Sequence, residues 1–577
     1  MKNKILFLSL YLITLVYTNI CKAQSGVSER LYISTDRGAY IAGEVMWLSV
    51  YCFDISKSKD MLSDLSNVAY IEIHNSNGVV MTSKIALTGG RGSGRITFPP
   101  NLPTGNYRLT GYTKQMLNEE KVEYFEKIFS LYNTLTSERV PGNVTIGEDD
   151  AKKSPALDQS LKNDISQNEK FISLEIGEKG KEITKNSSFK LALKNITKER
   201  MTLNISVVRS DSIPEPDSPL LMEYLPDVRK SSVGARFTGK YTPEYEGEII
   251  KGRIFYEGSD LITEKIAFLS AANGESDIYT SSIDSSGNIV FYTNSIYGDR
   301  NIVVEVPKTD SNSKMSFEIF DPFVKTTNKP VPSLILGSRI EKSLNERSIE
   351  MQIGRRFGAD TLFERISVKR DPLLSIKPVV YKLDDYTRFT LMQEVVVEYV
   401  SELRFRKVDE RTDLQVRWVD GYNSMTYSRD NTLVLIDGIA VFDHKRVMDY
   451  DPLKVKSISI YGSKFFIGLA SYAGIVSIKT YKGNFPGLTF NKNVRIVDYQ
   501  GVQYPCRFTG KDIVSASNIP DLRSLLLWEP HIDLSSSDKT DLTVYTPSYP
   551  GKFIVKLEGI TSNGTPFNYS KVINVNN

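Results

Sequence analysis

The sequence predicts a mainly β protein, built from tandem antiparallel β-sandwiches with one small α+β domain in its C-terminal half. Short runs rich in Val, Ile, Tyr, Phe and Thr recur along the chain, separated by Gly, Asn, Asp and Pro, which is typical of stacked sandwiches. Clear examples are residues 68–73, 201–208, 249–256, 289–292 and 301–306. A chain of 577 residues is long enough for about four domains of roughly 150 residues.

The first 23 residues have the pattern of a secretory signal peptide. Lys2 and Lys4 precede an apolar run at 5–17, and Cys21 and Ala23 are the small residues that signal peptidase requires. This run is shorter than the roughly 20 residues that a membrane-spanning helix needs. We therefore expect cleavage after Ala23 and an exported protein. The alternative is that Cys21 becomes a lipidated N-terminus.

Removing residues 1–23 leaves a chain without net charge. The segment holds three of the 72 basic residues and none of the 69 acidic ones, which leaves 69 of each sign. Such a balance offers no electrostatic footprint for nucleic acid or for an anionic membrane. No later apolar run is long enough for a transmembrane helix, so we expect at most peripheral membrane association, through partner proteins.

Cysteine and histidine are scarce in the rest of the chain. Cys52 and Cys506 lie in segments that we assign to different domains, so whether they pair stays open. None of His74, His444 and His531 has a glutamate three residues later, as a carboxypeptidase-type zinc site would need. We expect no metal and no cofactor.

Residues 35–51 (TDRGAYIAGEVMWLSVY) and 98–113 (FPPNLPTGNYRLTGYT) have the spacing of the two ends of one sandwich of about 100 residues. The first stretch resembles the opening strands of the macroglobulin-like domains of alpha-2-macroglobulin, and the second resembles their closing strands. The resemblance implies a macroglobulin-like sandwich over residues 24–135. Its motif residues, to which we give structural roles, are Asp36, Tyr40, Gly43, Glu44, Gly105 and Tyr107.

Two further sandwiches are expected before the middle of the chain. Residues 171–240 look like a degenerate second macroglobulin-like copy, supported only by the strand LNISVVRSD at 203–211. Residues 243–256 and 281–292 resemble the carboxypeptidase regulatory-like sandwich, a non-catalytic module, which implies such a domain over 241–325.

Two segments interrupt this pattern. Residues 136–170 are polar, with little to bury, and we interpret them as a linker. Residues 326–390 are interpreted as a linker that contains one helix, because Ile349, Ile353 and Phe357 follow a helical spacing.

Residues 433–443 (LVLIDGIAVFD) and 451–483 contain a buried strand, a turn and a strand that ends in Thr-Tyr-Lys-Gly. They resemble the plug domain of TonB-dependent receptors, which implies a small α+β domain over 391–485. Ala440 stands where that family usually has proline. We interpret Asp437 and Gly438 as a turn rather than as a carboxylate site. The motif residues are Asp437, Gly438, Gly468, Gly474, Thr480 and Gly483.

A plug domain normally lies inside a barrel of about 22 strands, each of about 9–11 residues. Only 94 residues follow Gly483, and their pattern instead indicates a C-terminal sandwich over 486–577. We therefore expect no transmembrane barrel and no transport by this chain alone.

Together these resemblances imply a non-enzymatic envelope protein of a Gram-negative bacterium, in the periplasm or associated with the outer membrane. The chain lacks the Gly-Cys-Gly-Glu-Gln thioester motif, and GGRGSG at 89–94 lacks the lysine and helix of a phosphate loop. The leading hypothesis is an accessory or docking subunit of an outer-membrane uptake or assembly complex, with outer-membrane or periplasmic protein partners. The alternatives are a macroglobulin-like protein that holds clients or proteases without a thioester, or a secreted adhesin-like protein.

Overall fold

Two compact units make up the chain in the computed structural model. Unit 1 contains Met1–Tyr245, Lys325–Ile366 and Pro505–Asn577, and unit 2 contains Glu246–Val324 and Ser367–Tyr504. The structure describes residues 27–147, 170–178, 180–231, 236–257, 266–273, 277–294, 296–307, 314–325, 329–357, 362–368, 376–408, 411–419, 425–427, 431–490, 494–508, 510 and 520–577. The predicted signal peptide and Cys21 lie outside these residues.

Strands dominate both units, which confirms the predicted mainly β fold class. The strands form several separate sheets, and most neighbouring strands are antiparallel. In the part of the chain that the structure describes, no helix is long and apolar enough to cross a membrane.

The first sandwich of unit 1 is formed by two sheets between residues 29 and 132. One sheet has three strands, in the order β1 (Glu29–Thr35), β3 (Val45–Asp54), β6 (Arg91–Thr97). The other has five, in the order β2 (Ala39–Ile41), β8 (Phe125–Tyr132), β7 (Gly105–Tyr112), β4 (Val68–Asn75), β5 (Gly78–Ala86). The sheets meet closely where Gly111 of β7 faces Ile33 of β1, because a Cβ at 111 would lie 2.6 Å from Ile33 Cδ1. A larger residue at 111 would push the two layers apart.

The second sandwich of unit 1 shows that two of the predicted domain boundaries are wrong. Its three-stranded sheet is β10 (Ile172–Ile176), β11 (Ser188–Asn195), β34 (Lys539–Tyr545). Its six-stranded sheet is β20 (Phe363–Arg365), β32 (Cys506–Phe508), β33 (Leu525–Leu534), β12 (Met201–Arg209), β35 (Gly551–Thr561), β36 (Pro566–Val575). The segments 171–240 and 486–577, expected as separate sandwiches, therefore supply two halves of one sandwich.

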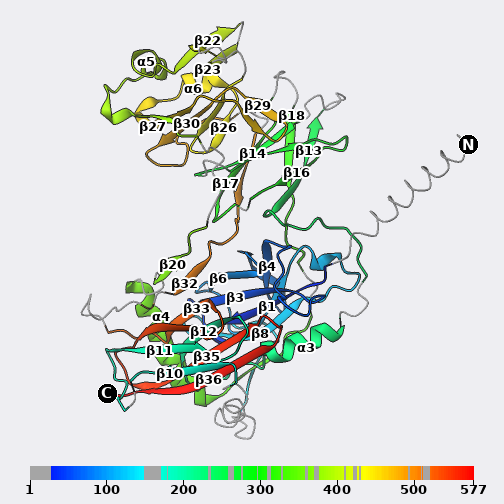
Figure 1. The fold of residues 1–577 in the computed structure, drawn as a ribbon, viewed down its shortest axis with the longest axis vertical. Coiled ribbons are helices and arrows are strands. Elements are labelled where there is room, and N and C mark those ends of the chain that lie inside the picture. The colour runs from blue at the N-terminus through cyan, green and yellow to red at the C-terminus, as the bar shows by residue number, and fades with distance from the viewer. Residues whose placement is uncertain are drawn as a thin grey trace, which may run out of the picture. The chain divides into compact units, whose positions relative to one another are not determined.

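Strand β12 explains why neither half stands alone. It pairs antiparallel with β33 on one side and with β35 on the other, so strands more than 300 residues apart in sequence are neighbours. In Figure 1 the red C-terminal strands accordingly lie among the blue and cyan strands of unit 1. The core between the two sheets mixes residues of both halves, such as Leu191, Ile205, Val555 and Phe567. Each half by itself would expose an apolar sheet face to water.

The two sandwiches of unit 1 contact each other through an apolar cluster around Trp47 and Phe508 and through polar side chains. Tyr32 and Ser34 lie on the face of β1 that points away from Ile33, since alternate residues of a strand point to opposite sides. Their hydroxyl groups donate hydrogen bonds to the carboxylate of Glu558 on β35, at 3.0 and 2.7 Å. Ser49 of β3 also donates to the carbonyl oxygen of Pro530, at 2.8 Å. The sheets of unit 1 are thus stacked in four layers.

Unit 2 begins with a sandwich that the sequence places at 241–325. One sheet is β16 (Asn288–Tyr292), β13 (Ile249–Glu257), β18 (Lys314–Ile319), and the other is β15 (Ile278–Ser282), β14 (Ile266–Ala271), β17 (Arg300–Glu305), β31 (Val494–Tyr499). Strand β31 was expected in the C-terminal sandwich, but it pairs antiparallel with β17. It does so because Val497 and Tyr499 pack on the core that contains Ile302 and Val304.

The rest of unit 2 is a mixed-sheet domain, by which we mean residues 379–490. Its sheet has the order β21 (Val379–Lys382), β27 (Val455–Tyr461), β30 (Ile475–Thr480), β25 (Leu433–Ile436), β26 (Ile439–Val441), and β25 runs parallel to β30. The other elements are η4 (Leu383–Asp385), α5 (Met392–Glu398), β22 (Leu403–Val408), β23 (Arg411–Val419), β24 (Met425–Tyr427), α6 (His444–Met448), η5 (Pro452–Lys454), β28 (Phe465–Ile467) and β29 (Ala470–Tyr472).

The mixed-sheet domain begins earlier than the predicted boundary at residue 391. Tyr381 of β21 pairs with Ile458 of β27, and the side chain of Leu383 is fully buried in the same core. Residues 379–390 are therefore part of this domain rather than of a linker.

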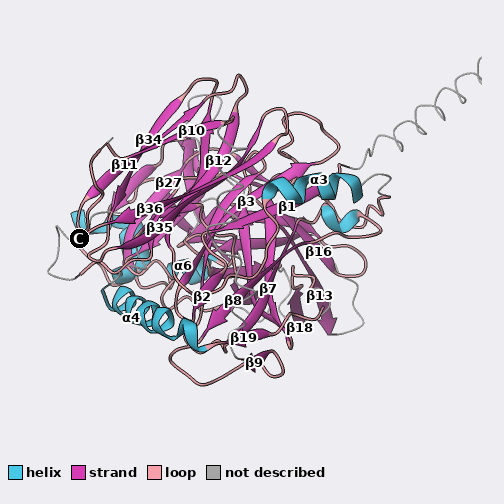
Figure 2. Cartoon of the chain, turned by 90° about the horizontal axis from the view of Figure 1, so that it is seen from below, coloured by secondary structure: helices cyan, strands magenta, loops and turns pink. Residues whose placement is uncertain are grey.

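The remaining elements belong to unit 1. They are η1 (Met116–Asn118), β9 (Val144–Ile146), α3 (Leu221–Ser231), β19 (Leu334–Leu336), η2 (Ser338–Ile340) and α4 (Glu341–Phe357). Helix α4 is where the sequence predicts a helix, but it packs on the first sandwich through Met351, so residues 334–357 are not a linker. Figure 2 shows α4 next to β2 and β19. Most of the other predicted linker, 136–170, lies outside the described residues, although β9 falls within it.

Candidate functional site

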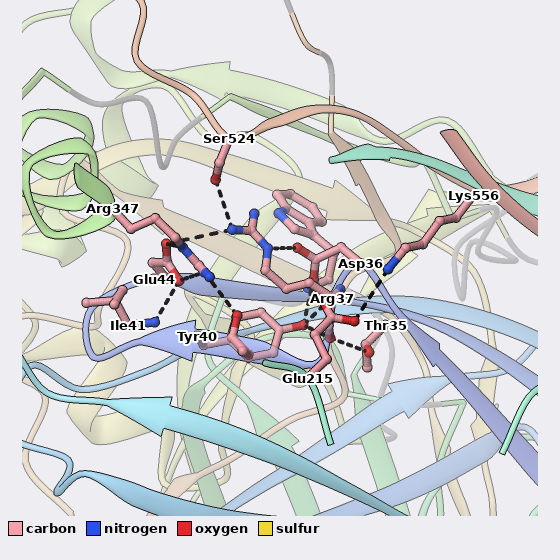
Figure 3. A network of polar contacts seen from close by, with 12 residues as sticks. Thr35, Asp36, Arg37, Tyr40, Ile41, Glu44, Glu215, Arg347, Ser524 and Lys556 are labelled. Carbon is pink, nitrogen blue, oxygen red and sulfur yellow. Dashed lines mark hydrogen bonds and ion pairs between the residues drawn. The ribbon is translucent and has the colours of Figure 1, made fainter. Parts of the chain in front are cut away.

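The segment between β1 and β3 brings together Asp36, Tyr40 and Glu44, three of the predicted motif residues, as Figure 3 shows. Asp36 is fully buried, and its carboxylate accepts hydrogen bonds from the Tyr40 hydroxyl at 2.8 Å, the Trp47 amide at 3.0 Å and Arg37 Nε at 2.9 Å. A buried carboxylate needs such donors because it has lost its hydration. The motif thus determines a closed polar turn.

Gly43 and Glu44 connect this turn to α4. Gly43 has φ +100°, and a Cβ there would lie 2.8 Å from the sulfur of Met351, so the position requires glycine for conformation and for space. Glu44 accepts a hydrogen bond from the Ile41 amide at 2.7 Å and forms an ion pair with Arg347 of α4, at 2.5 Å.

Arg347 is the central cation of this contact. Its side chain is 3% exposed, and its guanidinium also lies 3.6 Å from the Asp211 carboxylate and donates to the carbonyl oxygen of Ala39 at 3.0 Å. Asp211 lies two residues after the end of β12, a strand of the second sandwich. One side chain on α4 therefore joins both sandwiches of unit 1.

Two more charged groups complete the cluster. Arg37 donates to the Ser524 hydroxyl at 2.9 Å and lies 3.7 Å from Glu44. Burial works against the charge of Arg37, but Asp36, Glu44 and Glu350 hold its pKa above the usual value. We call Asp36, Arg37, Glu44, Asp211, Arg347 and Glu350 the polar joint. Because its central side chains are buried and paired, the polar joint holds these segments of unit 1 together.

Glu350 contributes a buried carboxyl group with a raised pKa to the polar joint. Burial, with the nearby Glu44 charge, raises the pKa of its carboxyl group to about 7. One oxygen accepts a hydrogen bond from the Ser524 amide, and the other, Oε2, is buried without a hydrogen-bond partner among the described residues.

We expect Glu350→Gln to change the pH dependence of stability. The folded state holds a proton on Glu350 that the unfolded chain releases near pH 4.3, so the wild type loses stability as the pH rises from about 4.5 to about 7. The glutamine variant lacks this loss, and its stability relative to wild type should improve by ~3 kcal/mol over that range. Urea unfolding at several pH values measures the difference. Glu341→Gln, at the exposed start of the same helix, is the control and should show no such trend.

The last two residues of the first motif lie outside the polar joint. Tyr107 donates from its hydroxyl to the carbonyl oxygen of Pro103, at 2.6 Å, and so ties the start of β7 to the preceding turn. Gly105 faces Val140, whose Cγ2 would lie 2.8 Å from a Cβ at that position. Both positions serve local packing.

The second motif is organised around Asp437. Asp437 and Gly438 have φ +50° and +87° and form the two-residue turn between β25 and β26, in the region where Asp and Gly are favoured. The Asp437 carboxylate accepts hydrogen bonds from the Thr480 amide at 2.7 Å, the Thr480 hydroxyl at 2.6 Å and the Phe485 amide at 2.7 Å. The Gly483 amide in turn donates to the Thr480 hydroxyl, at 3.0 Å. The motif closes the end of the sheet.

The other two glycines of this motif are contact points elsewhere in unit 2. A Cβ at Gly474 would lie 2.8 Å from Val416, and one at Gly468 would overlap Thr280 at 1.8 Å. Gly468 has φ +54° as well. These glycines let neighbouring segments approach closely and are not gathered with Asp437 into one site.

Asp211, Arg347 and Glu350 are not marked in the sequence as functional or motif residues. Their spacing in the sequence resembles that of any solvent-exposed charged residues, and only the fold brings them to Glu44. The sequence signal for this contact was Glu44 of the motif. A carboxylate that is buried in a turn needs a cation or hydrogen-bond donors nearby.

Unit 2 also has a small cavity, with room for about one water molecule. It is lined in part by Glu305, Phe442, Asp443 and Arg446. Burial, opposed by Arg446 and assisted by Asp443, raises the pKa of Glu305 to about 7. This cavity is too small for an organic substrate.

In the part of the chain that the structure describes, no group of three His, Cys, Asp or Glu side chains is placed to hold a metal ion. Cys52 and Cys506 are both free and buried, and burial raises the pKa of the Cys506 thiol to about 11.

Comparison with known proteins identifies no family. No family model matches the chain, and no curated protein does. Among solved structures, native E. coli alpha-2-macroglobulin overlaps with 9% identity and a TM-score of 0.23, over 96% of this chain and 40% of that one. Salmonella alpha-2-macroglobulin reacted with methylamine overlaps with 8% identity and a TM-score of 0.24, again over 96% and 40%.

A third overlap is with FdeC, an E. coli adhesin, at 10% identity and a TM-score of 0.14, over 54% of this chain and 65% of that one. The chain thus spans less than half the length of the bacterial macroglobulins that it overlaps. TM-scores of this size do not indicate a shared fold for the whole chain.

Proposed function

We propose that this chain is a non-enzymatic, exported envelope protein that acts as an accessory or docking subunit of an outer-membrane uptake or assembly complex. The observation that carries the proposal is a partly exposed aromatic surface on the mixed-sheet domain. We call Tyr381, Tyr386, Phe389, Tyr399 and Tyr481 the aromatic end.

The aromatic end is well ordered by contacts within unit 2. Tyr386 stacks on Tyr399 with ring centroids 4.4 Å apart, yet 41% of Tyr386 stays exposed. Tyr481 is 51% exposed and donates to Asp384, which also accepts a hydrogen bond from Arg388 at 3.1 Å. Tyrosine and arginine are enriched at the energetic centres of protein interfaces, and a side chain already held in place loses little entropy on binding.

The mixed-sheet domain is fixed to the sandwich of unit 2, which supports a role in presenting this surface. The rings of Phe268 and Phe442 lie 4.7 Å apart, and the Asn273 amide donates to the carbonyl oxygen of Asp437 at 2.8 Å. The Ala440 amide donates to the Ser270 hydroxyl at 3.3 Å. Unit 2 can therefore offer the aromatic end as a rigid body.

The proposal is tested by cross-linking in intact cells followed by affinity purification. We expect the wild type to recover an outer-membrane barrel protein in a fixed ratio, and the double variant Tyr386→Ala/Tyr481→Ala to recover at least tenfold less. Tyr292→Ala, an exposed tyrosine (53%) on the sandwich of the same unit, is the matched control and should recover the partner as the wild type does.

Other outcomes would favour the alternatives. Recovery of no membrane protein would contradict the docking role. Capture of a protease or an unfolded protein would favour a macroglobulin-like holding function, and release into the medium would favour an adhesin-like one. Peptidase activity of the purified protein that a chelator abolishes would overturn the non-enzymatic assignment.

A further inference from the structure

Strand β21 forms an open end of the sheet in the mixed-sheet domain. It is the last strand in the sheet order, and Val379–Lys382 pair antiparallel with residues 457–460 of β27 on one side. Alternate residues of β21 direct an amide and a carbonyl group away from β27, because a strand can bond neighbours on two sides. Among the described residues, no strand pairs with this second side. The second side of β21 can therefore accept a further strand.

The side chains of β21 give this end of the sheet little protection. Exposed end strands are usually protected by charged side chains or by a covering segment. Val379 and Val380 are instead apolar and 47% and 50% exposed. They point to opposite faces of the sheet, since successive residues of a strand alternate, so both faces are partly open to solvent. Pro378 has no amide hydrogen, which limits the open edge to the four residues of β21.

The aromatic end continues onto this strand. Tyr381 belongs to both β21 and the aromatic end, and the centroid of its ring lies 6.0 Å from that of Tyr386. Its hydroxyl donates a hydrogen bond to Glu402, which holds the ring in place. Val379 lies on the same face of β21 as Tyr381, because the two residues are two positions apart. A strand added to β21 would thus place every second side chain beside Val379 and Tyr381, where apolar side chains are favoured.

The charges beside β21 are mainly basic. Three lysines on β21 or next to its pairing with β27 are exposed: Lys377, Lys382 and Lys456. Two acids follow β21 in η4, and one of them, Asp384, forms an ion pair with Arg388 at 3.1 Å. The remaining acid, Asp385, is too little to balance the three lysines. An added strand is therefore favoured when it carries acidic residues next to Lys382.

We propose that β21 binds an extended segment of the partner protein as a further strand, with apolar side chains next to Tyr381 and acidic ones next to Lys382. This inference rests on the proposed function, because Tyr381 is shared with the aromatic end. A second copy of this chain is a less favourable occupant, since its own lysines would meet those of β21. In such a complex, backbone hydrogen bonds supply affinity and the alternating side chains supply specificity.

A synthetic peptide tests this pairing independently of any partner in the cell. The peptide has eight residues of alternating valine and glutamate, and fluorescence anisotropy measures its binding to the purified protein. We expect a peptide of alternating valine and lysine to bind at least tenfold more weakly, because its charges repel those beside β21. Lys382→Glu should weaken binding of the glutamate peptide at least tenfold. Lys571→Glu, which changes an exposed lysine on the end strand β36, is the matched control and should leave binding unchanged.

Hydrogen exchange of the peptide complex shows whether the peptide is added as a strand. We expect the amides of alternate residues within Val379–Lys382 to gain at least tenfold protection, because their hydrogen bonds on the second side of β21 form only in the complex. The amides of β36 should keep their exchange rates. Binding without new protection in β21 would overturn the proposal. So would equal binding of the two peptides, or no binding of either.

The result in cells separates this inference from the proposed function. If an outer-membrane protein is recovered through the aromatic end but the peptide gives no protection in β21, the docking role stands and the strand pairing is wrong. If the peptide pairs with β21 and no membrane protein is recovered, the docking role is contradicted and the strand-binding edge stands.

Discussion

Replacing Arg347 with alanine is expected to lower the free energy of unfolding of unit 1 by ~3–5 kcal/mol, because it leaves buried carboxylates without their cation. Of its cationic partners among the described residues, Glu44 would keep Arg37 alone, at 3.7 Å, and Asp211 would lose the guanidinium 3.6 Å away. Removing one partner of a buried ion pair costs more than the pair itself contributes, since the remaining charge stays desolvated. Chemical unfolding of the purified protein measures this loss.

Two variants separate this effect from a general weakening of α4. Arg356→Ala changes an exposed arginine of the same helix and should shift stability by no more than ~0.5 kcal/mol. The double variant Glu44→Gln/Arg347→Met removes both charges and should recover part of the loss, because no charge is then left unpaired at Glu44. If Arg347→Ala cost no more than Arg356→Ala, the polar joint would not be what holds α4 to the two sandwiches.

Replacing Asp437 with alanine is expected to destabilise unit 2 by ~3–4 kcal/mol. The substitution leaves three donors in the closed end of the sheet without an acceptor: the Thr480 amide, the Thr480 hydroxyl and the Phe485 amide. Each buried unsatisfied group costs about 1–3 kcal/mol. Alanine also tolerates the φ of +50° less well than aspartate does.

Hydrogen exchange tests this prediction at single residues. The amides of Thr480 and Phe485 should lose protection in Asp437→Ala, and those of β12 in unit 1 should not. Asp437→Asn keeps the turn conformation but has one acceptor oxygen, so an intermediate loss is expected. Asp443→Ala removes the N-cap hydrogen bond of α6 and an ion pair with Arg446, at a half-exposed position, and should cost about 1 kcal/mol. Equal losses for Asp437→Ala and Asp443→Ala would contradict the structural role of Asp437.

Several features could be predicted because they depend on residues close together in the sequence. The Asp437-Gly438 turn is one, since two residues with positive φ between apolar runs suffice to indicate a hairpin. The strands of residues 68–73 and 201–208 are others, because β-branched and aromatic residues between turn residues favour them locally. Helix α4 also follows from the spacing of its apolar residues, although the side of it that is buried does not.

Strand pairing and burial could not be predicted in the same way, because they depend on residues that are far apart in the sequence. Strand β12 looked like part of a second, separate sandwich, whereas its partners β33 and β35 lie more than 300 residues later. A strand carries no local mark of which distant strand will cover its apolar face, because many strands would satisfy the same hydrogen bonds. For the same reason, β31 was predicted in the C-terminal sandwich, whereas it pairs with β17 in the sandwich of unit 2.

The sequence by itself thus determined a mainly β fold and the two motif turns, through local conformational preferences. Only the tertiary structure decided that the chain segments before and after the sequence of unit 2 form one sandwich of unit 1, and that Glu44 pairs with Arg347 in the buried polar joint. The physical reason is that burial of a charge depends on which segments exclude water from it, and that is a property of the assembled layers. Helix α4 likewise buries Arg347 and Met351 while Ile349 and Phe357 stay exposed, which the spacing of its apolar residues alone did not determine.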